Sequence, residues 1–153
     1  MHLTYKTGTA TREQILQHLR ACDGNFIPAL SSRVDLNDYS RKLSEKAVSF
    51  ECWDNDVLAG MLNSYLDNGS ESGFISNVSV LHGYAGRGLG SSLLHMCLDY
   101  AADHGFRNIR LEVSPQNTPA VKLYSRAGFH WIPNPGGSYL MQLEIPAVRQ
   151  SRR

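Results

Sequence analysis

The segment from Asn77 to Gly90, NVSVLHGYAGRGLG, combines a strand-like apolar run, a glycine-rich turn and the start of an amphipathic helix. Its glycines let the backbone turn tightly, so that N–H groups can approach a phosphate closely. The helix that starts near Gly88 directs the positive end of its dipole to the same place. This pattern predicts a site for a phosphorylated cofactor. The predicted phosphate-binding residues are Gly86, Arg87, Gly88, Leu89, Gly90 and Ser91.

Two familiar phosphate-binding motifs do not fit this turn. A P-loop closes with Gly-Lys-Ser or Gly-Lys-Thr, whereas this turn closes with Gly88-Leu89-Gly90-Ser91. A dinucleotide fingerprint has the spacing G-x-G-x-x-G in a first βα unit, but here the spacing is G-x-G-x-G and lies past the middle of the chain. A glycine-rich turn is a weak signal by itself, and a plain surface loop is the alternative. The downstream sequence favours the cofactor site.

Residues 111–129, LEVSPQNTPAVKLYSRAGF, together with GYAGRGLG, resemble the GNAT superfamily of acetyl-CoA-dependent N-acyltransferases. The resemblance covers about residues 57–145. Two positions depart from the usual pattern: Ala85 stands where Gln or Arg is common, and His82 stands where Pro is common. The change to Ala85 removes a long side chain that could contact phosphate, but it leaves the backbone donors in place.

The resemblance implies acetyl-CoA as co-substrate, with its pyrophosphate on the glycine turn. In the family, two parallel strands splay apart and the pantetheine arm bonds to the first of them like an added strand, which here maps to Val78, Ser79 and Val80. A backbone N–H near Val80 would then donate to the thioester carbonyl, an interaction typically worth about 3 kcal/mol in the transition state. Asn117 is expected to bond the pantetheine amides, and capping the next helix is its alternative role.

Tyr124 matches the family tyrosine that protonates the departing thiolate. It lies seven positions after Asn117, so about two helical turns would bring it near the pantetheine arm. A core aromatic beside Leu123 is the alternative reading of Tyr124.

The sequence offers more than one candidate for the general base that deprotonates the amine. Glu112 resembles the glutamate assigned as base in peptide N-terminal acetyltransferases of the ribosomal-protein type, but it could equally be a surface carboxylate held by Arg110 or Lys122. His82 is a second candidate, because an imidazole is a common general base, and a solvated loop imidazole is its alternative reading. A third alternative is a chain of water molecules that relays the proton, which would leave no trace in the sequence.

Substrate selection is expected in the loop from Phe26 to Tyr39 and in the loop around Asn134 to Ser138. The predicted substrate-binding residues are Arg33, Tyr39 and Asn77. The first half of the chain does not match the ribosomal-type enzymes, which favours small amines or amino sugars as acceptors. The preferred function is an N-acetyltransferase that acts by direct transfer in a ternary complex. The alternatives are a peptide N-terminal acetyltransferase and a non-catalytic acyl-CoA sensor.

Length and charge favour one domain over residues 1–153, with a solvated tail from about residue 147. The chain has 153 residues and a mass of 17.0 kDa, and its 15 Lys+Arg against 14 Asp+Glu give a formal charge of +1. This balance gives no reason to expect nucleic acid as a partner. No apolar run approaches a membrane span, so we expect a cytoplasmic protein. Family members often form homodimers, but the sequence shows no interface signature.

The three cysteines, Cys22, Cys52 and Cys97, have no C-x-x-C spacing. They therefore indicate neither a zinc site nor a disulfide framework, and no metal is expected. Cys97 lies on an apolar helix face, which predicts a buried core thiol rather than a nucleophile.

Hydrophobic periodicity and turn residues predict the elements that position these groups. We expect Thr11 to cap the first helix, Asn37 or Asp38 to cap the second, and Thr118 to cap the helix that carries Tyr124. Gly105 and Gly128 are expected to end their helices in a left-handed conformation. The predicted strands are His2–Lys6, Val48–Trp53, Val57–Leu66, Phe74–Leu81, Asn108–Val113, Phe129–Ile132 and Tyr139–Ile145.

The predicted order is β-α-α-β-β-β-α-β-α-β-β. Together with the resemblance, it indicates an α/β (α+β) protein of the GNAT fold. We expect a mixed, mostly antiparallel sheet with helices on both faces and one β-α-β unit that binds the cofactor.

Overall fold

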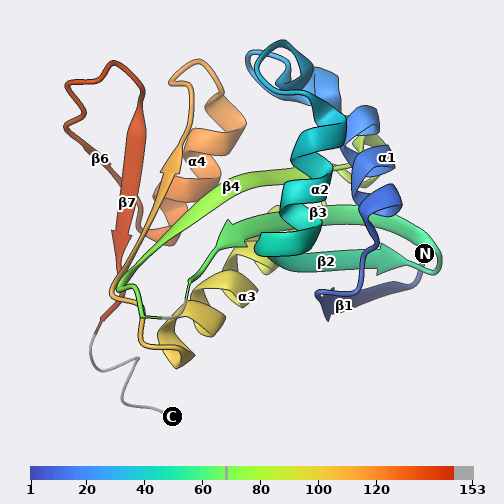
Figure 1. Cartoon of the computed structure of the whole chain (residues 1–153), viewed down its shortest axis with the longest axis horizontal. Coiled ribbons are helices and arrows are strands. Elements are labelled where there is room, and N and C mark those ends of the chain that lie inside the picture. Colours follow the sequence, from blue (N-terminus) through green and yellow to red (C-terminus); the bar gives the residue numbers. More distant parts are fainter. Residues whose placement is uncertain (68, 147–153) are drawn as a thin grey trace.

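The computed structural model describes residues 1–67 and 69–146, and it contains one seven-stranded sheet (Figure 1). The strand order is β1-β2-β3-β4-β5-β7-β6. Neighbouring strands are antiparallel except for β4 and β5, which are parallel, so the prediction of a mostly antiparallel sheet is confirmed. The strands are β1 (Leu3–Thr7), β2 (Val48–Asp54), β3 (Val57–Tyr65), β4 (Ser72–Val80), β5 (Asn108–Glu112), β6 (His130–Ile132) and β7 (Leu140–Glu144).

Helices cover both faces of the sheet, as predicted (Figure 1). The first two helices pack on each other over one face, and the third packs on β2, β3 and β4 from the other face. The order of helices and strands along the chain is the predicted one. The helices are α1 (Arg12–Cys22), α2 (Leu36–Lys46), α3 (Leu89–Asp103) and α4 (Thr118–Ala127), with short 3-10 turns η1 (Asp23–Asn25), η2 (Leu30–Ser32) and η3 (His82–Tyr84). None of the helices in the described ranges is long and apolar enough to cross a membrane.

The cap of α1 is the predicted one, but the cap of α2 is not. Thr11 accepts a hydrogen bond from the Gln14 backbone N–H at 3.2 Å, and the Gln14 side chain accepts one from the Thr11 N–H at 2.8 Å. The prediction of Asn37 or Asp38 as the cap of α2 is wrong. Asp35 is extended, and its carboxylate accepts from the Asp38 N–H at 3.0 Å, so the helix begins earlier than predicted.

The cap of α4 is also displaced from its predicted position. The prediction of Thr118 is wrong because Thr118 is already helical. Asn117 holds the cap position, and its Oδ1 accepts from the Ala120 N–H at 3.4 Å. Gly105 and Gly128 follow α3 and α4 with φ of +81° and +109°, so both predicted left-handed stops are confirmed.

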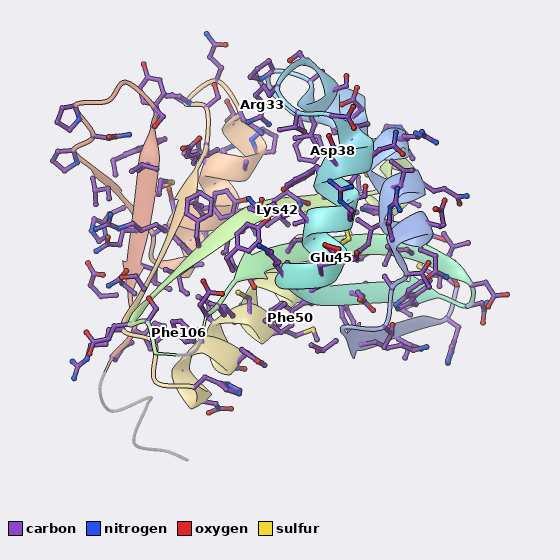
Figure 2. The ribbon with its side chains drawn as sticks, viewed as in Figure 1. Arg33, Asp38, Lys42, Glu45, Phe50 and Phe106 are labelled. Atoms are coloured by element: carbon purple, nitrogen blue, oxygen red, sulfur yellow. The ribbon has the colours of Figure 1, made fainter. Side chains whose placement is uncertain are left out.

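An apolar core fills the space between the sheet and α3. Phe50 and Phe106 belong to it, with 2% and 1% of their surface exposed (Figure 2). Cys97 lies in this core, and burial raises the pKa of its thiol to about 12, so the predicted buried thiol is confirmed. The cysteines are unpaired. The predicted tail from about residue 147 and Asn68 of the turn before β4 lie outside the described residues.

The parallel strands β4 and β5 stay together for only part of their length. Their pairing runs from Ser72 opposite Asn108 to Ile75 opposite Leu111. Beyond Ile75, β4 continues to Val80 along its other neighbour β3, without a partner on the β5 side. This parting of the strands sets the position of the site.

Candidate active site

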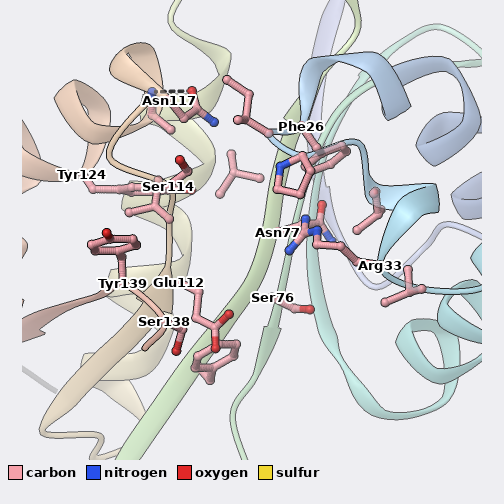
Figure 3. Close-up of a pocket in the computed structure, with 18 of the residues that line it drawn as sticks. Phe26, Arg33, Ser76, Asn77, Glu112, Ser114, Asn117, Tyr124, Ser138 and Tyr139 are labelled. Carbon is pink, nitrogen blue, oxygen red and sulfur yellow. Dashed lines mark hydrogen bonds between the residues drawn. The ribbon is translucent and has the colours of Figure 1, made fainter. Parts of the chain in front are cut away.

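A pocket of about 410 Å³ opens where β4 and β5 part (Figure 3). Five segments line it: the connection between α1 and α2, helix α2 itself, strand β4, the segment from β5 into α4, and the loop before β7. Because it has lining residues that belong to both faces of the sheet, the pocket reaches through the gap between the strands. Its residues are Phe26, Ile27, Pro28, Leu30, Arg33, Val34, Tyr39, Phe74, Ser76, Asn77, Val78, Glu112, Val113, Ser114, Asn117, Ala120, Tyr124, Ser138 and Tyr139.

The edge of β4 that faces this gap presents backbone groups. The Leu81 N–H donates to the Ala59 carbonyl at 2.8 Å on the β3 side. Peptide groups alternate in direction along an antiparallel strand, so the N–H groups of Val80 and Val78 point the opposite way, towards the gap. The three residues predicted to meet the pantetheine arm therefore differ in their orientation. The backbone N–H groups of Val78 and Val80 face the gap. The Ser79 backbone faces β3 instead, and its side chain points towards α1.

The glycine turn lies at the carboxyl end of β4, next to the pocket but outside its lining. Gly86 and Gly88 have φ of +76° and +80°, a conformation that favours glycine. Helix α3 then begins with no side-chain cap and no acidic residue in its first turn, so its first N–H groups are free to bind an anion. Gly90 of the turn lies close to the pocket residue Val78, because a Cβ built at Gly90 would be 4.0 Å from the Val78 side chain.

Tyr124 combines the two roles considered from its sequence. It is 7% exposed, and its ring packs edge-on against Phe129 at 5.7 Å between centroids. It also lines the pocket from α4 (Figure 3). Burial raises the pKa of its hydroxyl far above the ordinary value, so the group keeps its proton at neutral pH. Burial alone causes this shift, with no hydrogen bond from a described residue, which leaves the hydroxyl proton available to a ligand.

Glu112 and His82, the two candidate bases, lie in different places. Glu112 is exposed on β5 and lines the pocket. Within the described chain it forms no ion pair with Arg110 or Lys122, and Arg110 instead donates to the Gln142 amide oxygen at 2.6 Å. His82 is exposed in η3 and is not among the pocket residues.

Asn117 lies in the pocket while it caps α4. Its Oδ1 is taken by the Ala120 N–H, and this leaves the Nδ2 group as a donor for a ligand. The two readings of this side chain are therefore compatible.

A β-bulge brings two successive residues of β4 to the same tyrosine. Asn63 pairs with Asn77 and Ser64 pairs with Ile75, so Ser76 is the extra residue. As a result both Ser76 and Asn77 hydrogen-bond to the Tyr39 hydroxyl of α2, the latter at 3.1 Å from its Nδ2. Burial raises the pKa of Tyr39 above its ordinary value, so this hydroxyl is also protonated.

Behind Asn77, buried polar groups continue towards α1. The Asn77 Oδ1 accepts from the Ser79 hydroxyl at 3.3 Å, and this hydroxyl lies 3.0 Å from His18 Nε2. His18 Nδ1 lies 2.9 Å from the Leu58 carbonyl. Desolvation lowers the pKa of His18, which is 3% exposed. His18 and Ser76 are not among the residues predicted from the sequence. The spacing of His18 with Ile15, Leu19 and Cys22 on the buried face of α1 is the signal that could have found it.

Arg33 is the third predicted substrate residue and lies on the wall opposite Glu112 (Figure 3). Its backbone N–H donates to the Leu30 carbonyl at 3.0 Å in the η2 turn. Seven of the predicted site residues thus line one pocket: Arg33, Tyr39, Asn77, Val78, Glu112, Asn117 and Tyr124. Throughout the described ranges there is no group of three or more His, Cys, Asp or Glu that could hold a metal ion.

Comparison with known proteins gives one family. A family model described as the acetyltransferase (GNAT) family matches residues 12–129. Mycothiol acetyltransferase from Corynebacterium glutamicum is 35% identical over 77 residues, which is 50% of this chain and 26% of that protein. The match thus spans about a quarter of that relative's length.

Two solved structures have the same fold. The ribosomal-protein-S18-alanine N-acetyltransferase from Escherichia coli has a TM-score of 0.76 and 19% identity, covering 94% of each chain. The PaiA N-acetyltransferase from Thermoplasma acidophilum, in complex with coenzyme A, has a TM-score of 0.74 and 13% identity, covering 94% of this chain and 99% of the other. At these identities the likeness concerns the fold.

Proposed function

This chain belongs to the GNAT family of acetyltransferases, and from that membership we propose that it moves an acetyl group from acetyl-CoA to the primary amine of a small molecule. The observation that carries the proposal is the parting of β4 and β5, which leaves an edge of free backbone groups along a pocket. The complex of a structural neighbour with coenzyme A supports acetyl-CoA as the co-substrate.

The residues around the gap fit this co-substrate. The uncapped first turn of α3 and the left-handed glycines before it would hold the pyrophosphate through backbone N–H groups. The backbone of Val78 and Val80 and the free Nδ2 of Asn117 would hold the pantetheine amides. Because most of these contacts use backbone donors, the missing long side chain at Ala85 removes one contact and leaves the rest.

Acetyl-CoA supplies an activated acetyl group as a thioester. The amine nitrogen forms a bond to the acetyl carbon, the carbon–sulfur bond breaks, and the products are an amide and the free thiol of coenzyme A. The Val80 N–H would stabilise the negative charge that develops on the carbonyl oxygen. Tyr124 keeps its proton at neutral pH and would give it to the departing sulfur.

The attacking amine must lose its proton, because a typical amine with a pKa of about 10.4 is protonated at neutral pH. We assign this step to Glu112, which lines the pocket on the same side as Tyr124 and has no ion-pair partner among the described residues. His82 lies outside the pocket and is the weaker candidate.

Two alternatives remain as proposals of their own. The structural likeness to the ribosomal-protein-S18-alanine N-acetyltransferase supports a peptide acceptor. The loss of the long side chain at Ala85 supports a non-catalytic acyl-CoA sensor.

The test is calorimetric titration with acetyl-CoA, followed by thiol release against amines, amino sugars and short peptides. We expect binding and amine-dependent thiol release, and we expect Glu112→Gln to lower the rate about 100-fold. Glu45→Gln, an exposed carboxylate on α2, is the matched control. Binding without release from any acceptor would favour the sensor, and release from peptides alone would favour the peptide enzyme.

A further inference from the structure

Two opposite charges face each other across the pocket. Among the described residues that line it, Arg33 and Glu112 carry a formal charge, and they come from opposite walls (Figure 3). Within the described part of the chain neither forms an ion pair. A pocket with one free cation and one free anion suits a ligand that carries both charges, because each charged group then gains a partner as water leaves the pocket.

The loop that carries Arg33 has a fixed backbone, although the Arg33 side chain itself is exposed. The Asp23 carboxylate accepts from the Ser31 N–H at 2.7 Å and from the Ser31 hydroxyl at 2.6 Å, which ties the loop to the end of α1. The η2 turn then fixes the backbone of Arg33.

Between the two charges the pocket walls carry apolar side chains beside the polar side chains of Ser76, Asn77 and Ser138. The connection between α1 and α2 contributes aliphatic and aromatic side chains, and further aromatic side chains come from β4 and the loop before β7. These apolar lining residues are Phe26, Ile27, Leu30, Val34, Phe74 and Tyr139. A ligand that fills this space must carry an apolar body as well as its two charges.

We propose that the acceptor is an amine that also carries a carboxylate and an apolar body, as a hydrophobic amino acid does. Its amine lies towards Glu112 and Tyr124, where the acetyl group is transferred, and its carboxylate pairs with the Arg33 guanidinium, whose planar donors suit a carboxylate. This inference rests on the proposed acetyl transfer and names its acceptor class.

Pairs of amines that differ only in the carboxylate test the inference. Phenylalanine and 2-phenylethylamine form one pair, and leucine and 3-methylbutylamine form another. In the wild type we expect kcat/KM for each amino acid to exceed that of its partner about tenfold or more. Arg33→Gln should lower kcat/KM for the amino acids about 10- to 100-fold through KM, and its effect on the two simple amines should be much smaller.

Arg41→Gln is the matched control, because Arg41 is an exposed arginine on α2 that pairs with Asp38 outside the pocket. It should behave like the wild type with all four amines. Equal use of both members of each pair by the wild type would overturn the inference and leave the acetyltransferase proposal intact. An equal loss for both members in Arg33→Gln would also overturn it. Binding of acetyl-CoA without thiol release from any amine would overturn both proposals.

Discussion

The two sides of the pocket are built differently. The proposed cofactor side, made by the β4 edge at Val78 and Val80, the turn at 86–91, Asn117 and Tyr124, offers mainly backbone donors. The proposed acceptor side, made by the connection at 26–34 with Tyr39, Ser76 and Asn77, offers side chains. A site made of backbone groups depends on chain conformation and tolerates side-chain changes such as Ala85. A site made of side chains changes its ligand preference when those side chains are substituted.

The acceptor side is also supported from behind by a buried polar network. Asn77 is held by the Asn63 Oδ1 at 2.7 Å and by the Ser79 hydroxyl at 3.3 Å, and Ser79 in turn meets His18. Buried polar groups must be paired to be tolerated, so this network fixes the orientation of the Asn77 amide. The face of the sheet under α3 is apolar by contrast, and it supports the fold rather than a ligand.

The largest effect is expected on the cofactor side from Tyr124→Phe. The variant keeps the ring packed against Phe129 but lacks the proton donor, so kcat should fall about 100- to 10,000-fold while acetyl-CoA affinity stays unchanged. Steady-state thiol release and calorimetry measure the two quantities. Tyr100→Phe, a partly buried tyrosine on α3 that packs against Phe50 at 5.6 Å, is the control. A full rate in Tyr124→Phe would remove this residue from the mechanism.

A smaller effect is expected from Gly88→Ala, which tests whether backbone conformation makes the phosphate site. The added Cβ meets no atom within 4 Å, but the φ of +80° costs a non-glycine residue about 1–2 kcal/mol. Relaxation of that strain would move the N–H groups, so acetyl-CoA affinity should fall about tenfold by calorimetry. Gly83→Ala also adds a Cβ in open space, without a positive φ, and should leave affinity unchanged. Equal affinities for both variants would argue against the turn as the pyrophosphate site.

On the acceptor side, Tyr39→Phe removes the hydroxyl shared by Ser76 and Asn77. Losing one such hydrogen-bonding group costs about 1 kcal/mol, so KM for the amine should rise about fivefold. The affinity for acetyl-CoA should not change, because the hydroxyl lies on the acceptor side. A loss of cofactor affinity with an unchanged KM would show that the two sides are not separate.

The smallest effect is a pH dependence of stability from His18. Its pKa is lowered on folding from 6.5, so the unfolded chain binds the proton more readily. The contribution to stability is therefore complete above pH 6.5 and is lost as pH falls towards the lower pKa of the folded state. Urea unfolding at pH 7.5 and 5.5 should show a larger loss for the wild type than for His18→Gln. An equal loss in both proteins would exclude His18 as the titrating group.

The fold could be predicted from the sequence more fully than the site. Periodicity and turn residues gave every helix and strand in order, and the glycine turn with residues 111–129 indicated the cofactor side. The caps of α2 and α4 were predicted too late in the chain, although Asp35 and Asn117 hold these positions. Neighbouring polar residues compete for one cap position, and tertiary packing decides between them.

Long-range pairing explains what the sequence could not reveal on the acceptor side. The bulge at Ser76 exists only in the register of β4 against β3, so alternation along β4 alone does not show that Ser76 and Asn77 both meet Tyr39. The contact of His18 with Ser79 likewise joins α1 to β4 across the fold.

The most direct test of the gap between β4 and β5 as the acetyl-CoA site is a nitrogen-15 NMR titration of the protein with acetyl-CoA. The amide signals of Val78 and Val80 and those of residues 86–91 should shift together and saturate at one affinity. Signals of β1, at the far edge of the sheet, should stay in place. Saturable shifts elsewhere, with the signals of Val78, Val80 and the turn unmoved, would contradict the assignment of the gap as the cofactor site.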